Sequence, residues 1–327
     1  VIEGAGLSVL EGRSIKAALD IDLGDDAERH EALQRIVAEA ELLGAWVQQH
    51  TQENATKSPV SDALELLRRT TEQDIEPDPT KGGGVRIREG VAVDRLISIS
   101  DPEMRHGRKS RSKTIKGYKR HIIIANRIVL GTAVEPANRP EREPTARLFE
   151  AARLHGQIVS AQFDRGYLSS PEVAKMWKDG VEIHSRAWGT STSGKFDKSD
   201  FQISVDTGVV ACPAGKLARI TRSGSVAFEE DDCRRCPIKP HCTDSRRRTL
   251  RVHENEKLLI ELRAAAARPE GRATYRNRTC VEHRLARITA VQGDKARYRG
   301  VRKNEFDLNR AAAVVNLQEL SRLRRAS

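Results

Sequence analysis

The sequence lacks any apolar run of about 18 residues, the length that a membrane-spanning helix requires. It also lacks, at its start, the basic residues and long apolar stretch that form a secretory signal peptide. These two absences predict a cytoplasmic protein without a membrane partner. The chain begins at Val1 rather than at a methionine, and we therefore expect a fragment or the product of a non-standard start.

Cysteine is scarce, with five residues in the chain. In the cytoplasm such cysteines are reduced or bound to metal more often than paired in disulfides. Four of them cluster, and structural zinc sites use such thiolates around a Cys-x2-Cys turn. Two interpretations stay open, a zinc site with His241 as a substitute ligand or reduced thiols that pack as small apolar groups. The four are Cys212, Cys233, Cys236 and Cys242.

Basic residues exceed acidic ones, and the chain of 327 residues carries a net charge of +11. Such a balance favours a polyanionic partner, with double-stranded DNA as the first expectation. The alternative is a basic surface that is solvated and has no partner. The length leaves room for about two domains.

The apolar pattern indicates an α/β protein. Helices are expected over 25–50, 58–73, 144–155, 170–180, 254–267, 272–290 and 306–324. Strands are expected over 95–100, 118–125, 128–135, 157–163 and 181–185, with short ones over 201–205 and 217–222. Residues 76–84 are rich in Pro and Gly and predict a loop. We therefore divide the chain into a helical segment 1–84, a core 85–189, a Cys-rich β insertion 190–250 and a helical part 251–327.

Two acidic residues stand where a metal-dependent phosphoryl-transfer enzyme needs them. Asp164 ends an apolar strand, and Glu282 closes a Tyr-x2-Arg-x3-Glu pattern with Tyr275 and Arg278. At about 100° per residue, Tyr275, Arg278 and Glu282 lie on one helical face. Carboxylates that are held close together bind two metal ions, which activate both oxygens of a phosphodiester exchange. The alternatives are a surface ion pair and an Asp that forms a turn.

A dense basic stretch covers residues 105–120 and contains Tyr118. It has no Asn or Gln to read adenine edges, so we expect contacts to the phosphate backbone, with a charged loop as the alternative. The candidate DNA-binding residues there are Arg108, Lys109, Arg111, Lys113 and Lys119.

Several segments together resemble bacterial insertion-sequence transposases of the DDE class. They are DPEMRHGRKS (101–110), GYKRH (117–121), FDRGY (163–167), CPAG (212–215), VEHRLAR (281–287), ARYRG (296–300) and NL (316–317). The resemblance covers roughly residues 15–320. It implies a ribonuclease H-like mixed sheet flanked by helices, with the Cys-rich insertion placed before the C-terminal helices.

The resemblance also implies roles for individual residues. Asp164 and Glu282 correspond to the second Asp and the Glu of a metal-binding triad, and Tyr275 and Arg278 to residues that grip the transposon end. Relatives often have Lys seven residues after the Glu, where this chain has Thr289, so Arg287 or Arg284 is the expected substitute.

The first Asp of the triad has no clear counterpart. We expect it upstream of Val1, with Asp20 or Asp22 as weaker candidates. The chain would then hold two of three acids and would not complete strand transfer.

The expected function is transposition. A homodimer on DNA would cleave and join strands at insertion-sequence ends with Mg²⁺ or Mn²⁺, and structural Zn²⁺ is a further expectation. The main alternative is a zinc-stabilised DNA-binding remnant without catalysis, and a third is a repair or restriction nuclease on the same fold.

Overall fold

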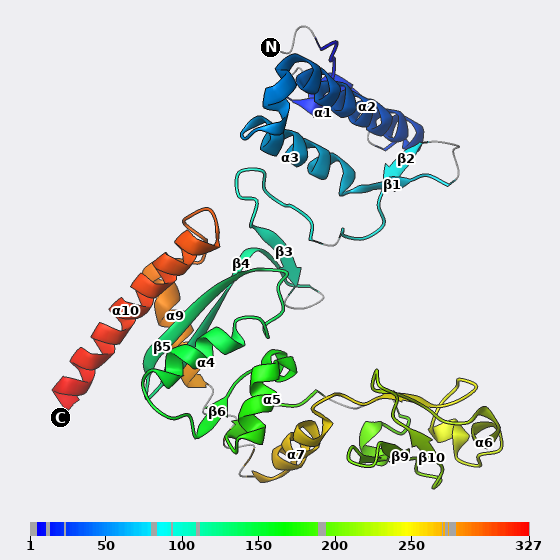
Figure 1. Ribbon diagram of the computed structural model, residues 1–327, viewed down its shortest axis with the longest axis vertical. Coiled ribbons are helices and arrows are strands. Elements are labelled where there is room, and N and C mark those ends of the chain that lie inside the picture. The colour runs from blue at the N-terminus through cyan, green and yellow to red at the C-terminus, as the bar shows by residue number, and fades with distance from the viewer. Residues whose placement is uncertain are drawn as a thin grey trace. The chain divides into compact units, whose positions relative to one another are not determined.

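The computed structural model describes residues 5–10, 14–22, 24–79, 84–92, 94–108, 112–188, 194–269, 271, 274 and 279–326. It is a mixed α/β structure with helices and several small sheets (Figure 1). Two compact units are present, and each is described by itself. Unit 1 comprises Val1–Lys119, Pro136–Asn138 and Ala296–Asn304, and unit 2 comprises Arg120–Glu135, Arg139–Lys295 and Glu305–Ser327.

Unit 1 starts with helices. The short α1 (Ile15–Leu19) precedes α2 (Asp26–Thr51), which begins after Asp25 because its carboxylate accepts hydrogen bonds from the first free backbone N–H groups. The 3₁₀ turn η1 (Gln52–Thr56) leads to α3 (Val60–Glu72). The helices expected over 25–50 and 58–73 are confirmed.

Glu39 ties α2 to the N-terminal segment of unit 1. Its buried carboxylate accepts hydrogen bonds of 2.8–2.9 Å from the backbone N–H groups of Ser8, Val9 and Leu10. Burial would raise the pKa of Glu39, but the hydrogen bonds from Ser8 and from the backbone outweigh burial and lower the pKa to about 2. An interior helix acid therefore fixes the path of residues 8–10.

The end of this helical region differs from prediction in two respects. The first two residues of the expected loop 76–84 belong to β1 (Ile75–Pro77), which pairs antiparallel with β2 (Val85–Ile87), and Pro77 is tolerated there because it ends a short edge strand. Residues 95–100 form no strand, and Leu96 makes a single bridge to Arg105. The reason is that the Gln73 side chain bonds both backbone groups of Leu96, at 2.8 and 3.1 Å, in place of a strand.

The basic stretch forms an antiparallel hairpin. β3 (Arg105–Arg108) pairs with the first residues of β4 (Thr114–Ala125), and Arg108 stands opposite Thr114. Residues 105–108 and 114–120 of the basic stretch are therefore strand rather than loop.

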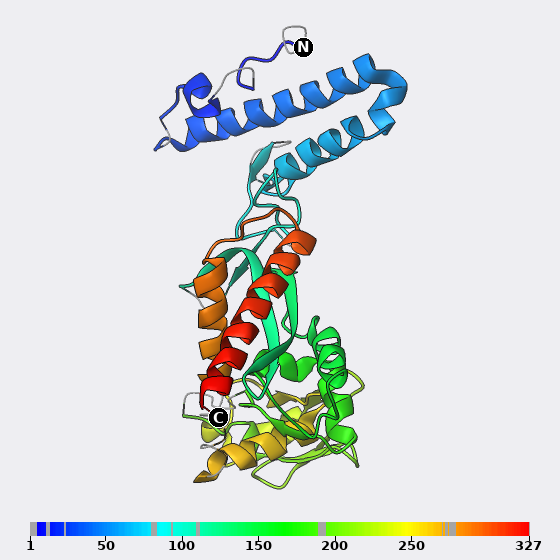
Figure 2. The same ribbon diagram turned by 90° about the vertical axis from the view of Figure 1, so that its left-hand side faces the viewer.

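In unit 2 the rest of β4 runs beside β5 (Ile128–Pro136), with helices on both faces. On one face lies α4 (Thr145–Arg153). A Cβ added at Gly131 of β5 would meet Ala151 of α4 at 2.7 Å, so glycine permits this close approach. On the other face lie α9 (Thr279–Gln292) and α10 (Val301–Ala326), which run side by side (Figure 2). The next β5 residue, Thr132, bonds Asn309 of α10 at 2.7 Å, as expected because successive strand residues face opposite sides.

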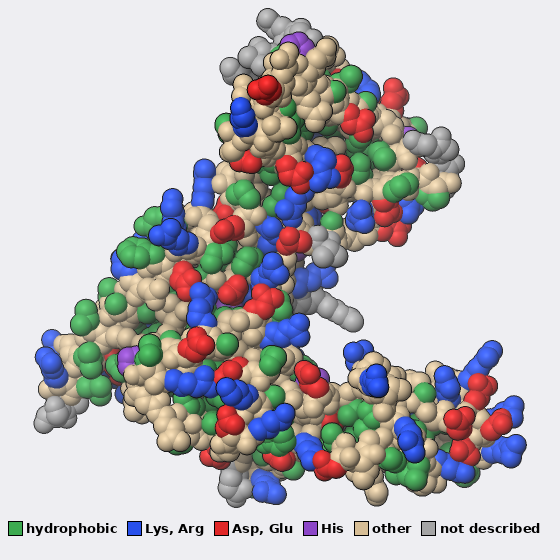
Figure 3. Space-filling view, in the orientation of Figure 1, with side chains coloured by type: hydrophobic (Ala, Val, Ile, Leu, Met, Phe, Trp, Pro, Cys, Tyr) green, Lys and Arg blue, Asp and Glu red, His purple; other side chains and the backbone are tan. Residues whose placement is uncertain are grey.

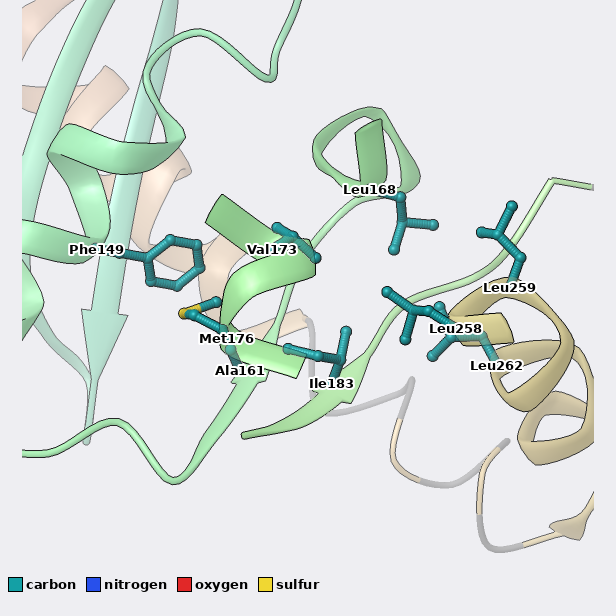
Figure 4. Packing of buried hydrophobic residues seen from close by; sticks show 9 residues of the cluster. All are labelled: Phe149, Ala161, Leu168, Val173, Met176, Ile183, Leu258, Leu259 and Leu262. Carbon is teal, nitrogen blue, oxygen red and sulfur yellow. The ribbon is translucent and has the colours of Figure 1, made fainter. Parts of the chain in front are cut away.

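A second group of elements in unit 2 shares one apolar core. It comprises β6 (Ser160–Gln162), η2 (Arg165–Ser169), α5 (Pro171–Lys178), β7 (Glu182–His184) and α7 (Glu256–Ala267). β6 and β7 pair in parallel, and their side chains meet residues of η2, α5, α7 and α4 (Figure 4). The buried members are Phe149, Ala161, Leu168, Val173, Met176, Ile183, Leu258, Leu259 and Leu262. This core holds the strand that leads to Asp164.

The Cys-rich insertion has a separate small core around Phe201, Val210 and Phe228. Its elements are η3 (Lys198–Asp200), β8 (Gln202–Ser204), β9 (Val209–Ala211), β10 (Leu217–Arg219), β11 (Ser225–Ala227), α6 (Glu230–Arg234), η4 (Lys239–His241) and β12 (Thr249–Arg251). The order β10-β9-β8 makes one antiparallel sheet, and β11 pairs with β12 in another. Strands expected over 201–205 and 217–222 are present but shorter.

Candidate catalytic site

Asp164 lies immediately beyond a buried strand, as expected from the sequence. Phe163 extends the pairing of β6 through a bond of 3.1 Å from its N–H to the His184 carbonyl. Asp164 then caps η2 with extended backbone angles, and its side chain is exposed. The Tyr167 N–H donates to the Asp164 carbonyl at 3.0 Å, so the following turn is closed on this residue. The strand end presents a carboxylate to solvent on a fixed turn.

Glu282 occupies the first turn of α9, and its side chain is exposed. Thr274, which precedes this helix in sequence, lies beside β6, because the Gln162 side chain donates to the Thr274 carbonyl at 2.9 Å. Thr274 and the strand leading to Asp164 are therefore neighbours. Tyr275 and Arg278 lie outside the described residues.

The described part of the chain contains no group of three or more His, Cys, Asp or Glu side chains arranged to hold a metal ion. Asp20 and Asp22, the weaker candidates for a first Asp, serve local structure. Asp20 adopts a left-handed backbone after α1, and the Asp22 carboxylate accepts the Gly24 N–H at 2.7 Å.

The basic residues after Glu282 differ in accessibility. Arg284 is 5% exposed and donates to the fully buried Glu319 of α10 at 2.8 Å, so it anchors one helix to the other. The hydrogen bond from Arg284 is the main reason that the pKa of Glu319 is lowered. Arg287 also reaches Glu319, at 3.3 Å, but keeps 42% of its side chain exposed. Of the two, only Arg287 retains a surface for DNA.

A cationic side chain from another element, β4, lies beside Thr289. Arg120 of β4 donates to Thr289 Oγ1 at 3.0 Å and to Gln292 Oε1 at 2.8 Å. Burial lowers the pKa of Arg120. The guanidinium therefore stands beside the residue where relatives have Lys, a contact between distant segments that the sequence alone could not reveal.

The basic hairpin contains both structural and accessible cations. Arg105 is 11% exposed on its side chain and binds Asp94 at 2.7 Å, so it is an ion-paired structural cation. Arg108 and Lys113 are exposed, Lys119 is partly buried, and Lys109 and Arg111 lie outside the described residues. On the face of the molecule shown in Figure 3, Lys and Arg side chains are interspersed with Asp and Glu.

Three of the segments that carry the family resemblance meet in unit 1. The Tyr118 hydroxyl lies 2.7 and 2.8 Å from the two Asp101 oxygens, and the Gly300 N–H donates to both residues at 3.2 Å. Burial and then the bond to Asp101 raise the pKa of Tyr118. Asp101, which is 7% exposed, thus connects the segments DPEMR, GYKRH and ARYRG in one hydrogen-bonded cluster. Tyr118 therefore takes part in this hydrogen-bonded cluster.

The four clustered cysteines line one pocket in the insertion, together with Lys216, Asp232 and Arg248. Cys212 begins a turn in which the Gly215 N–H donates to the Cys212 carbonyl at 2.8 Å. Cys233 begins a second turn, in which the Cys236 N–H donates to the Cys233 carbonyl at 3.3 Å. Burial raises the pKa of Cys242, Arg248 lowers it, and the other three thiols raise it. The net effect raises the pKa of Cys242, and burial is its main cause.

Comparisons with known proteins give one finding. Residues 211–321, about a third of the chain, match a family model described as a transposase DDE domain. This segment contains all four clustered cysteines and Glu282 on α9. No curated protein and no solved structure matches the chain. No helix among the described residues is long and apolar enough to cross a membrane. This finding agrees with the resemblance of the chain's motifs to DDE-class transposases.

Proposed function

We propose that this chain cleaves and transfers DNA strands at insertion-sequence ends, with Asp164 and Glu282 as ligands of divalent metal on a ribonuclease H-like core. The observation that carries the proposal is the transposase DDE match over 211–321, because it contains Glu282. The placement of Thr274 beside Gln162 supports a common site for the two acids. Mg²⁺ or Mn²⁺ suits such a site, since hard cations prefer carboxylate oxygens.

The metal ions would activate water and then a DNA 3′-hydroxyl for in-line attack on phosphodiesters. The chain's own groups would orient the metals and grip DNA as a homodimer. The Tyr275 and Arg278 side chains are proposed to hold the transposon end.

The direct test is cleavage of DNA that flanks the reading frame of this chain, measured with Mg²⁺, with Mn²⁺ and with chelator. Metal-dependent nicks at defined ends support the proposal. DNA binding without any nick under all three conditions overturns it and favours a DNA-binding protein without catalysis.

We further propose that the basic hairpin contacts the DNA backbone without reading bases. Replacing Arg108 and Lys113 with Ala should weaken binding similarly for unrelated sequences and reduce the slope of log affinity against log salt by about 1–2, because about 0.9 counterion is released per phosphate contact. Fluorescence anisotropy over a salt series measures this slope. The matched control is Arg222→Ala, an exposed cation in the insertion. Weakening for one sequence alone would contradict backbone contact.

We also propose a structural zinc ion at Cys212, Cys233, Cys236 and Cys242. Their number, their two tight turns and their common pocket fit a four-thiolate site. The thiols would need to draw together around the ion, since no described group has coordinating geometry. A cation would also favour the ionised form of Cys242, whose pKa is raised by burial first and by the neighbouring thiols after it.

Purified chain should therefore contain about one zinc ion per molecule by mass spectrometry, and Cys233→Ser with Cys236→Ser should lose it. Chelation should lower the melting temperature of the insertion, because metal binding stabilises only the folded site. The control is Cys280→Ser, which removes a thiol from α9. A zinc-free wild type whose stability is insensitive to chelator would refute the site.

A further inference from the structure

Two adjacent residues of β4 reach the two elements that carry the proposed metal ligands. Arg120 and His121 are neighbours on the strand, so their side chains face opposite sides of the sheet. On one side Arg120 bonds Thr289 and Gln292 of α9, at 3.0 and 2.8 Å. Thr289 follows Glu282 by seven residues, about two helical turns, and therefore lies on the same face of α9.

On the other side His121 holds the turn after Asp164. His121 is 4% exposed, and its Nδ1 lies 2.5 Å from the Tyr167 hydroxyl. The two rings meet edge to face with centroids 5.9 Å apart. The Tyr167 N–H also donates to the Asp164 carbonyl at 3.0 Å, and the Tyr167 ring packs near Phe163, with the ring centroids 6.3 Å apart. The position of Tyr167 thus fixes the turn that presents Asp164.

The surroundings of this turn are tightly packed. A Cβ added at Gly166 would clash with a carboxylate oxygen of Glu141. Glycine at this position therefore leaves room for the Glu141 side chain beside the backbone. Leu168, the residue after Tyr167, is fully buried in the core shown in Figure 4. By contrast, the Asp164 and Glu282 side chains are exposed. The core and the close approach at Gly166 therefore fix the backbone of the turn that carries Asp164.

We propose that Arg120 and His121 are positioning residues that fix the two carboxylates from one strand, Arg120 through α9 and His121 through Tyr167. The inference rests on the proposed function and names what orients its site. Neither residue needs to touch metal or DNA. A metal site tolerates little misplacement, because an error of about 1 Å costs about 10²-fold in rate and the groups that support ligands affect affinity by about 10–100-fold.

The test uses Mn²⁺ alone as the probe, with its dissociation constant measured by electron paramagnetic resonance on the full chain. Tyr167→Phe removes the hydroxyl but keeps the ring, and Arg120→Met keeps the aliphatic stem. Each should weaken Mn²⁺ binding about 10-fold or more. His121→Leu should do the same, while His121→Asn, whose amide can bond Tyr167, should recover part of the affinity.

The matched control is Thr132→Val. It removes a bond of 2.7 Å from the neighbouring strand β5 to α10, which carries neither proposed ligand. Thermal unfolding of every variant shows whether its fold is retained. Mn²⁺ affinity in Tyr167→Phe and Arg120→Met that equals the Thr132→Val value would overturn the inference.

The wild type and Asp164→Asn separate this failure from failure of the proposed function. If Asp164→Asn weakens Mn²⁺ binding but Tyr167→Phe and Arg120→Met do not, the function stands and the positioning role is wrong. If the wild type binds no Mn²⁺, or Asp164→Asn binds it equally well, both proposals are wrong.

Discussion

Replacing Asp164 with Asn, or Glu282 with Gln, should lower metal-dependent strand cleavage by about 10³-fold or more, equivalent to about 4 kcal/mol of transition-state stabilisation. Each change removes one negative charge and one oxygen ligand from the proposed site and keeps the side-chain shape. Because both side chains are exposed, we expect the melting temperature to stay within about 2 °C of the wild type.

The measurement is the rate of DNA nicking at saturating Mg²⁺, followed by a titration with Mn²⁺. The matched control is Asp179→Asn, which removes an exposed carboxylate at the end of α5 in the same unit. Its nicking rate should equal that of the wild type. Retention of full activity by either ligand variant would remove that residue from the mechanism.

The sequence located Asp164 because a buried strand followed by a turn has a clear local pattern. Apolar residues alternate up to Phe163, and the chain then turns at Asp164, as the bond from Tyr167 shows. The helices α2, α3 and α10 were likewise predictable, since their apolar residues recur at helical spacing over many residues. Local signals therefore found the long elements and the residue at the strand end.

Contacts between distant segments could not be predicted. The burial of Arg284 depends on Glu319, and the sequence offers no sign that these two residues meet. From its cationic neighbours, Tyr118 was interpreted as part of a basic DNA-binding stretch. In the structure its hydroxyl is hydrogen-bonded to Asp101 and to the Gly300 N–H. In each case the residue type and its neighbours in sequence were uninformative, since the partner comes from another part of the fold.

Loss of the buried Glu256 should strongly destabilise unit 2. It begins α7 with no exposed surface and binds Lys198 of η3, Arg263 at 3.1 Å and the His253 N–H at 2.9 Å. Glu256→Ala leaves two cations and an N–H without their acceptor, so we expect a loss of about 3–5 kcal/mol in the free energy of unfolding. The control is Glu254→Ala, an exposed acid two residues earlier, which should change stability by about 0.5 kcal/mol or less.

The same residue should make stability depend on pH. Burial would raise the pKa of Glu256, but the hydrogen bonds from Lys198 and from the His253 backbone outweigh burial and hold the pKa below its usual range. A carboxyl whose pKa is lower in the folded state stabilises the protein above its unfolded pKa of about 4.3, and this contribution is lost as pH falls through the folded pKa. The wild type should therefore exceed Glu256→Gln in unfolding free energy at pH 7, and the difference should shrink steadily below about pH 5. Urea unfolding at pH 7, 5, 4 and 3 measures this difference. A difference that stays constant over the range would mean that the ionised carboxylate does not provide the stabilisation, and that Glu256 acts through its shape and hydrogen bonds alone.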